Sequence, residues 1–171
     1  MQGNLAGVVV ELFADDGSIP NSRLPVVIYR QALAGDDASA EAMETLFDGN
    51  GWPSAWRYGV YDFHHYHSNT HECLGVARGS AKLQLGGQQG REFFVAAGDV
   101  IVLPAGVGHK NLGASGDFMV VGAYPPGFSS DLMRAHDGER PGADQRIAKV
   151  PLPKTDPVGG QGGPLLEQWV G

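Results

Sequence analysis

GVYDFHHYHSNTHECLGVARG, residues 59–79, holds four of the six histidines in this chain together with one glutamate. Buried imidazoles and carboxylates are costly unless they find partners, so this concentration favours a shared site over scattered core positions. Side chains of a β-strand alternate between two faces. His65 and His67 therefore lie on one face, and the alternation excludes His64 from any site that uses them.

Two geometries are open for the glutamate that follows. If the strand continues unbroken, His71 joins His65 and His67, and Glu72 faces away. The tripeptide SNT at 68–70 is turn-prone, however, and a turn there lets a new strand begin at Glu72 with its carboxylate facing inward. The alternate residues after Glu72 then form an apolar interior. This second geometry gathers two imidazoles and a carboxylate, a ligand set that suits a divalent first-row metal.

A second segment, GDVIVLPAGVGH at 98–109, supplies a histidine on another strand. Gly98–Asp99 forms a tight turn into the apolar run VIVL. Pro104 and Gly106 then reverse the chain, and His109 opens the next strand. Taken alone, this segment predicts a hairpin with a histidine at its end.

Together the two segments resemble the cupin superfamily, which is recognised by two motifs. The first motif, G-x5-H-x-H-x(3–4)-E-x6-G, is matched with the longer spacing by Gly59, His65, His67, Glu72 and Gly79. The second motif, G-x5-P-x-G-x2-H-x3-N, is matched by Gly98, Pro104, Gly106 and His109. The final asparagine of this motif is not matched, because position 113 is glycine; the nearest asparagine, Asn111, lies two residues after His109. That asparagine is not a metal ligand in the family, and the joint match is far more specific than either half.

The resemblance implies an all-β fold, a double-stranded β-helix (jelly-roll) barrel, with one metal ion inside. Carried over position by position, the metal ligands would be His65, His67, Glu72 and His109. The ion would be one divalent transition metal (Fe, Mn, Ni, Co or Zn), with one or two coordination positions open for water, dioxygen or substrate. Glu72 also argues against the thiol dioxygenases of the superfamily, whose ligand set lacks a glutamate.

The wider chain resembles a small bacterial group of single-domain cupins, the YjlB-like proteins. The stretches that carry this likeness are DDGSIPNSRLPVVIYRQAL (15–33), NGWPSAWRYGVYDFHHYHS (50–68), AYPPG (123–127) and GERPGADQRIAKVPLPKTDPV (138–158). The likeness implies no particular reaction. We expect one domain over 1–171, with N-terminal strands and a helix in 1–55, a barrel core at about 56–124 and a C-terminal arm in 125–171.

Hydrophobic periodicity predicts one early helix and many short strands. The helix is expected over 36–51. Its cap candidates are Asp36, Asp37 and Ser39, and its end candidates are Gly49 and Gly51. From Trp56 the period changes to two, which favours an antiparallel sandwich or barrel. The expected strands are 7–13, 24–29, 56–67, 72–78, 81–85, 92–96, 99–103 and 117–124.

The segment 125–171 differs in composition, because it holds seven of the eleven prolines. Proline breaks both helices and central strands, so we expect an irregular C-terminal arm. One or two short helical turns are expected in it, for example at 130–136. Leu165, Leu166 and Trp169 are expected to dock the end of the arm on the barrel.

Composition limits the partners of the chain. Twelve Lys and Arg residues against nineteen Asp and Glu residues give a net charge of −7, and the absence of a basic run argues against nucleic-acid binding. The chain shows neither an apolar run long enough to cross a bilayer nor a signal peptide. Cys73 is the only cysteine, so no disulfide can form within one chain. We expect a cytoplasmic protein with no nucleic-acid or membrane partner.

Four further side chains near the first motif are candidates for a role. Tyr61 and Phe63 share the face of the ligands and fit either pocket lining or ordinary barrel core. His71 fits an exposed loop histidine or one that fixes the turn. The functional alternatives are a hydrogen-bond donor to a metal ligand, a proton shuttle or a substitute metal ligand. Cys73 faces the opposite side and fits a small buried residue. Tyr61 and His71 are therefore the catalytic candidates.

These features predict a metal-binding cupin that acts as an enzyme on a small-molecule substrate. The ligand set is compatible with dioxygenation, with isomerisation of a sugar or keto acid, and with decarboxylation; superfamily analogy favours dioxygenation slightly. The alternative is a non-catalytic cupin that binds a metal or small molecule as a sensor or carrier. A metal-free cupin that keeps the motif for structure is a third reading. Jelly-roll sheet edges invite pairing, so a homodimer is expected.

Overall fold

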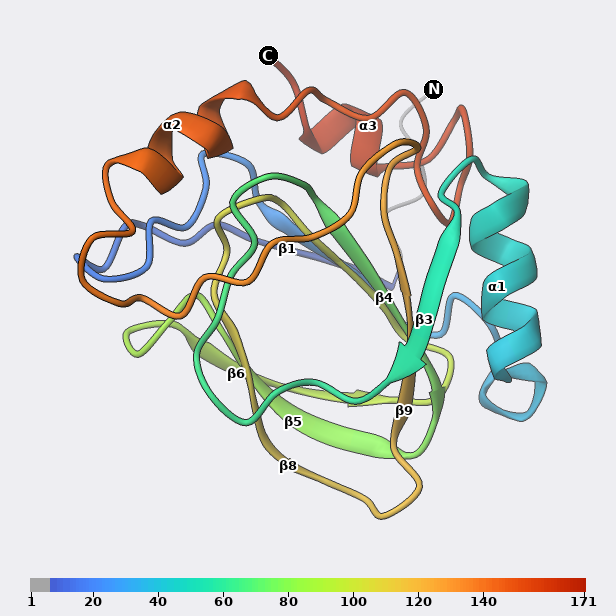
Figure 1. Ribbon diagram of the computed structural model, residues 1–171. Coiled ribbons are helices and arrows are strands. Elements are labelled where there is room, and N and C mark those ends of the chain that lie inside the picture. The colour runs from blue at the N-terminus through green and yellow to red at the C-terminus, as the bar shows by residue number, and fades with distance from the viewer. Residues whose placement is uncertain (1–6) are drawn as a thin grey trace.

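The computed structural model describes residues 7–171, which form two antiparallel sheets facing each other around an apolar interior (Figure 1). Six strands in the order β1-β2-β7-β4-β9-β3 form one sheet, and three in the order β6-β5-β8 form the other. The first sheet contains β1 (Val8–Glu11), β2 (Val26–Tyr29), β7 (Val100–Leu103), β4 (Glu72–Arg78), β9 (Met119–Ala123) and β3 (Ser54–Tyr58). The second contains β6 (Arg91–Ala96), β5 (Ser80–Leu85) and β8 (His109–Ala114). The predicted all-β jelly-roll barrel is confirmed.

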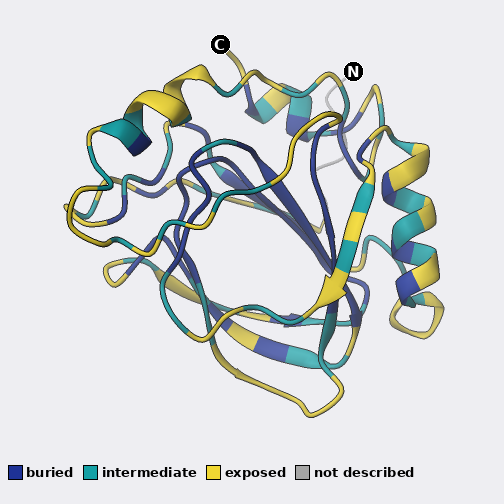
Figure 2. Ribbon diagram, viewed as in Figure 1, coloured by how far each residue is buried: buried dark blue, intermediate teal, exposed yellow. Residues whose placement is uncertain are grey.

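The strand β4 shows how alternation sorts side chains between the two faces of the larger sheet. Leu74 and Val76 point into the barrel, where they pack against apolar side chains of both sheets. Cys73 and Ala77 point outward and pack beneath the elements that cover the outer face. All four are buried, and Figure 2 shows the dark band of buried strands at the centre of the molecule. Cys73 is thus the small buried residue that the alternation predicts.

Helix α1 (Ala40–Gly49) covers the outer face of the six-stranded sheet (Figure 1). It begins after Ser39, whose hydroxyl accepts a hydrogen bond of 3.0 Å from the backbone N–H of Ala42. Ser39 is therefore the cap among the three candidates, because its oxygen satisfies a backbone donor that the first helical turn leaves unpaired. Gly35–Asp37 forms a separate 3₁₀ turn, so the helix is shorter at its start than the predicted range of 36–51.

The packing of α1 on the sheet depends on one glycine of β4. Met43 and Phe47 are fully buried on the helix face that meets the sheet. A Cβ atom at Gly75 would lie 2.6 Å from the Phe47 ring and 2.8 Å from Met43 Sδ. The glycine therefore lets the helix approach the strand closely. The helix in turn covers the outer face of β4, the strand that begins with Glu72.

The strand predicted over 56–67 is interrupted in the structure. After β3 the chain is irregular, and Gly59 and Asp62 fall in this part; both residue types are depleted in strands. Two single antiparallel bridges follow, His65 with His109 and Tyr66 with Met133. His65 and Tyr66 thus bridge to different segments of the chain. The alternation of side chains resumes here, and His65 and His67 face the same side.

The arm holds two short helices, but the position 130–136 given for a helical turn is wrong. Met133 is extended there and exchanges two backbone hydrogen bonds of 2.9 Å with Tyr66, so the arm adds a short bridge instead of a helix. The helix of this region, α2 (Gly142–Lys149), comes later and directly follows Pro141. Proline is favoured at a helix start, because its fixed φ suits the first turn and its missing N–H would have no partner there.

The end of the arm docks as predicted. Helix α3 (Leu165–Gln168) buries Leu165, and Trp169 after it is buried against the outer face of the six-stranded sheet. The Trp169 indole N–H also donates to the backbone carbonyl of Pro25 at 2.7 Å. Leu166 is only half-buried. Across residues 7–171, no helix combines the length and hydropathy that a bilayer crossing requires.

Candidate metal centre

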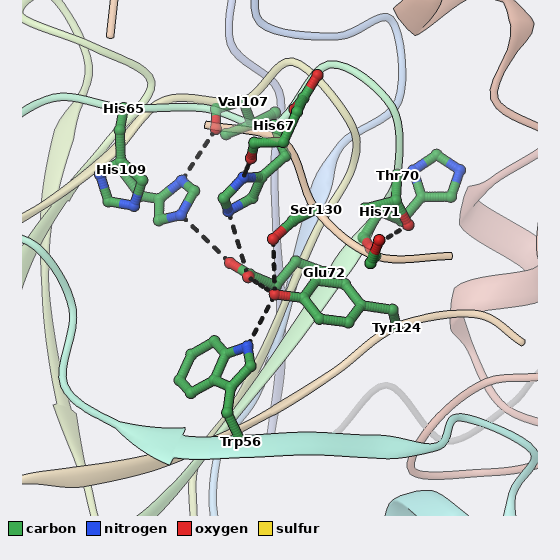
Figure 3. A network of polar contacts seen from close by, with 12 residues as sticks. Trp56, His65, His67, Thr70, His71, Glu72, Val107, His109, Tyr124 and Ser130 are labelled. Carbon is green, nitrogen blue, oxygen red and sulfur yellow. Dashed lines mark hydrogen bonds and ion pairs between the residues drawn. The ribbon is translucent and has the colours of Figure 1, made fainter. Parts of the chain in front are cut away.

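Three histidines from two segments converge inside the barrel (Figure 3). His65 forms the single β-bridge with His109, which is the first residue of β8. His67 lies two residues after His65, just before the turn that leads into β4. One ring nitrogen of each lies within 4.8 Å of the other two, and all three residues are buried. Among residues 7–171 this is the one cluster in which three or more such groups could share a metal ion. His64 lies outside it, as the alternation predicts.

Each of these imidazoles is oriented by a hydrogen bond from its Nδ1 atom to a backbone carbonyl. The pairs are His65 with Phe63 (2.9 Å), His109 with Val107 (3.1 Å) and His67 with Asp131 (2.5 Å). A carbonyl oxygen can only accept, so Nδ1 carries the proton in each pair. In the neutral ring this leaves the lone pair on Nε2, which is the form that binds a metal.

Glu72, the first residue of β4, lies beside two of the three histidines. Its two carboxylate oxygens lie 3.2 Å from His67 Nε2 and 3.3 Å from His109 Nε2. The chain turns at Ser68–Thr70, and the carboxylate faces the barrel interior. The geometry with a turn is therefore the one adopted, and the unbroken strand is excluded.

Burial and neighbouring charges set the protonation of the cluster. Burial, with the charge of His109, lowers the pKa of His65 to about 2, so this imidazole is neutral. Burial also disfavours a charged His67, but the adjacent Glu72 carboxylate outweighs it and raises the pKa of His67 to about 9. The pKa of Glu72 lies well below its ordinary range despite complete burial, because His67 and His109 stabilise the ionised form. Three imidazoles and one ionised carboxylate fit a divalent transition metal.

A tyrosine that the sequence analysis missed holds the carboxylate from the side of β9. The Tyr124 hydroxyl donates to Glu72 at 3.0 Å and accepts from the Trp56 indole N–H at 2.8 Å (Figure 3). Trp56 fits against β9 because Gly122 has no side chain: a Cβ there would lie 2.2 Å from the indole. The signal was present, since strand alternation places Tyr124 on the same face as the interior residue Val120.

His71 is buried and points away from the cluster (Figure 3), so the reading as an exposed loop residue is wrong. Its Nδ1 accepts a hydrogen bond of 3.0 Å from the Ala105 N–H, and its Nε2 therefore donates to the Pro151 carbonyl at 3.1 Å. The ring packs on Trp169 at 4.7 Å between centroids. Both nitrogens are occupied, which agrees with a residue that fixes the turn and opposes a substitute ligand. Burial lowers the pKa of His71 to about 4.

A cavity of about 410 Å³ gives access to the cluster. All four carried-over ligands line it, together with Tyr124, Ser130 and aromatic side chains of the rim. Tyr61 lines the rim, is 45% exposed and stacks on Phe63 at 4.9 Å between ring centroids. The structure therefore places Tyr61 as pocket lining.

The sequence and the fold both have known relatives. The cupin domain family matches residues 59–122. The uncharacterized protein YjlB of Bacillus subtilis is 45% identical over 159 residues, which cover 92% of this chain and 94% of YjlB. Two of the similar solved structures are a DUF861 family protein from Thermotoga maritima (21% identity, 48% of this chain and 86% of the other, TM-score 0.33) and an acireductone dioxygenase from Bacillus anthracis (13% identity, 76% and 80%, TM-score 0.36). The match to YjlB over nearly the whole length, with both motifs in place around the histidine cluster, shows that the chain belongs to the cupin superfamily and, within it, to the YjlB-like proteins.

Proposed function

We propose that this cupin is a metal-dependent enzyme that acts on a small organic molecule. One observation carries the proposal: three buried imidazoles and a carboxylate converge where they line a cavity. His65, His67, Glu72 and His109 would hold the metal. When bound, the ion would supply Lewis-acid chemistry or, as iron, redox chemistry.

The position of the ligands supports a catalytic site over a purely structural one. Structural metal sites are closed by protein ligands, whereas catalytic sites keep positions for water or substrate. A first-row metal with four protein ligands keeps one or two such positions when it is five- or six-coordinate. All four proposed ligands line the cavity, so a substrate could reach the same point.

The cavity walls indicate the class of substrate. Trp56, Tyr58 and Tyr61 give the cavity a largely aromatic wall. The one Lys or Arg among the described lining residues is Arg57, and its guanidinium is paired with Glu44 on α1 at 2.6 Å. A phosphorylated substrate would find no uncommitted Lys or Arg side chain there. We therefore propose a small neutral or weakly acidic molecule with a planar face, and place oxygen-dependent oxidation ahead of isomerisation or decarboxylation.

The first test is metal content. Protein purified without added metal, and apoprotein reloaded separately with Fe, Mn, Ni, Co and Zn, is analysed for its elements. We expect one ion per chain with at least one of these metals. His109→Ala should lose it, whereas His136→Ala, which changes an exposed histidine of the arm, should retain it. Failure of every metal to bind stoichiometrically would overturn the proposed centre.

The second test separates an enzyme from a binding protein. The metal-loaded protein is screened against catechols, sugars and keto acids under air and under nitrogen, with oxygen uptake and product formation measured. We expect turnover of a planar, unphosphorylated compound. Stoichiometric metal with no turnover in the whole screen would instead assign the protein to the sensor or carrier class.

A further inference from the structure

The C-terminal arm runs beside the turn that carries His67 and is fixed to it by side-chain hydrogen bonds. The Asp131 carboxylate accepts from the Ser68 backbone N–H at 2.7 Å and from the Ser68 hydroxyl. Asn69 binds the arm twice, accepting from the Asp131 N–H at 3.0 Å and donating to the Ser129 carbonyl at 2.9 Å. These contacts fix the backbone of residues 129–131 against the turn.

Helix α2 reinforces the same junction. Arg146 Nε donates to the Ser68 hydroxyl oxygen at 2.8 Å and lies 3.9 Å from the Asp131 carboxylate. A hydroxyl group can donate once and accept twice, so Ser68 accepts from Arg146 while it donates to Asp131. Ser68 is fully buried, and its polar atoms are satisfied only while the arm is in place.

The arm reaches one proposed ligand through its backbone. The carbonyl of Asp131 accepts the hydrogen bond from His67 Nδ1. The two other histidines differ in this respect, because each is oriented by a carbonyl only two residues before it, Phe63 for His65 and Val107 for His109. His67 alone among the three depends on a segment 64 residues away in the chain.

The arm reaches a second proposed ligand through Ser130. The Trp56 indole can only donate, and the Glu72 carboxylate can only accept. The single hydroxyl proton of Tyr124 is therefore given to Glu72, and the Ser130 hydroxyl, 3.0 Å from Tyr124, must be the donor of their shared bond (Figure 3). Ser130 thus fixes the Tyr124 hydroxyl in the orientation that holds Glu72.

We propose that Ser130 and Asp131 are positioning residues of the metal centre, orienting Glu72 and His67 from the C-terminal arm. The inference rests on the proposed metal-binding function and deepens it. Neighbours of metal ligands fix ring orientation and carboxylate direction, and losing one typically weakens metal binding by about 10–100-fold. The arm is therefore part of the metal centre and more than a cover for the barrel.

Cobalt(II) is the probe for the test, because it reports both affinity and ligand orientation. We compare wild type with Asp131→Ala, Ser130→Ala and Ser130→Thr. Ser129→Ala and Asp137→Ala are the matched controls, since they alter exposed side chains of the same arm. The dissociation constant for Co(II) is measured by competition with a chelator. The paramagnetically shifted imidazole N–H signals are followed by NMR in water.

We expect Asp131→Ala to weaken Co(II) binding by about 10–100-fold and to speed solvent exchange of one imidazole N–H signal, that of His67, while the other two stay protected. Ser130→Ala should weaken binding in the same direction without changing N–H exchange, and Ser130→Thr should restore it. Both control variants should match wild type. Thermal unfolding of the metal-free proteins checks that each variant is folded. If Asp131→Ala does not fold, Ser130→Ala provides the test, because it removes only one half-buried hydroxyl.

Equal Co(II) affinity in all variants would overturn the positioning role and leave the proposed metal centre standing. Faster exchange of all three N–H signals in Asp131→Ala would also overturn it, because the effect would then be general loosening. A wild-type protein that takes up no metal would refute the proposed function itself, and the inference would fall with it.

Discussion

At the scale of single residues, the decisive feature is the pairing of an ionised Glu72 with a protonated His67. The carboxylate is completely buried yet ionised, because two imidazoles approach its oxygens and the Tyr124 hydroxyl donates to one of them. His67 carries the compensating positive charge, since Glu72 raises its pKa to about 9. A metal ion must therefore displace a proton from His67 before it can use that ligand.

Metal uptake should for this reason release protons. At pH 7 the pKa of about 9 leaves His67 protonated, whereas His65 is already neutral. We expect at least one proton per Zn(II) at pH 7, and an affinity that rises with pH up to the pKa of His67. Calorimetry in buffers of different ionisation enthalpy measures the proton count. A count of zero at pH 7 would contradict the ion pair, and Glu72→Gln should lower the count by lowering the pKa of His67.

Tyr124→Phe tests the hydroxyl that holds Glu72. The change keeps the ring but leaves the Trp56 indole N–H without its acceptor, which costs about 1–3 kcal/mol of unfolding free energy. Metal affinity should fall by about tenfold or more. Tyr29→Phe is the matched control, because Tyr29 also donates a buried hydroxyl to a carboxylate, that of Asp156, outside the centre. Chelator competition and urea unfolding should show both variants destabilised and only Tyr124→Phe weakened in metal binding.

At the scale of elements, the sequence pattern correctly predicted strands whose formation depends mainly on residues close in the chain. Strand β4 matches its expected range of 72–78, because a continuous apolar run bounded by turn residues is typical of a strand covered on both faces. The arm between 129 and 133 could not be predicted in the same way. Its conformation follows from bonds to residues some sixty positions earlier, so local propensity suggested a helical turn there and was wrong.

The contact between α1 and β4 gives a prediction at this scale. Gly75→Ala places a Cβ within 2.6 Å of Phe47, so the helix must move outward. Overpacking of this kind costs about 1–3 kcal/mol, measured as a lower free energy of unfolding in urea. Gly116→Ala is the control, since its Cβ would meet no atom within 4 Å and should change stability little. Equal stability of the two variants would show that the helix packs on β4 with more freedom than the structure indicates.

At the scale of the whole molecule, β1 is an edge strand of the six-stranded sheet and β6 is an edge strand of the three-stranded sheet. Side chains link these edge strands through an ion pair of 2.9 Å between Glu11 and Arg91. Unpaired strand edges attract further strands. Leu12 follows β1 and Phe94 lies on β6, and each is more than 60% exposed. We propose that this side of the barrel forms the interface of a homodimer.

Light scattering after gel filtration tests the dimer. Wild type should elute with twice the chain mass of 18.1 kDa. Phe94→Glu should give a monomer, because a charge buried at an apolar interface is unfavourable. Leu152→Glu, which changes an exposed leucine of the arm, should remain dimeric. A wild-type protein of single-chain mass at all concentrations would refute the dimer.

The dependence of His67 on Asp131 has a consequence for the order of events during synthesis. A ribosome makes His67 64 residues before Asp131, whose carbonyl orients it. Helix α2, whose Arg146 donates to Ser68 at the same junction, emerges later still. A nascent chain can therefore close the barrel strands before its centre has reached full affinity for metal. Metal capture in the cell would then be a late, post-translational step that follows docking of the arm.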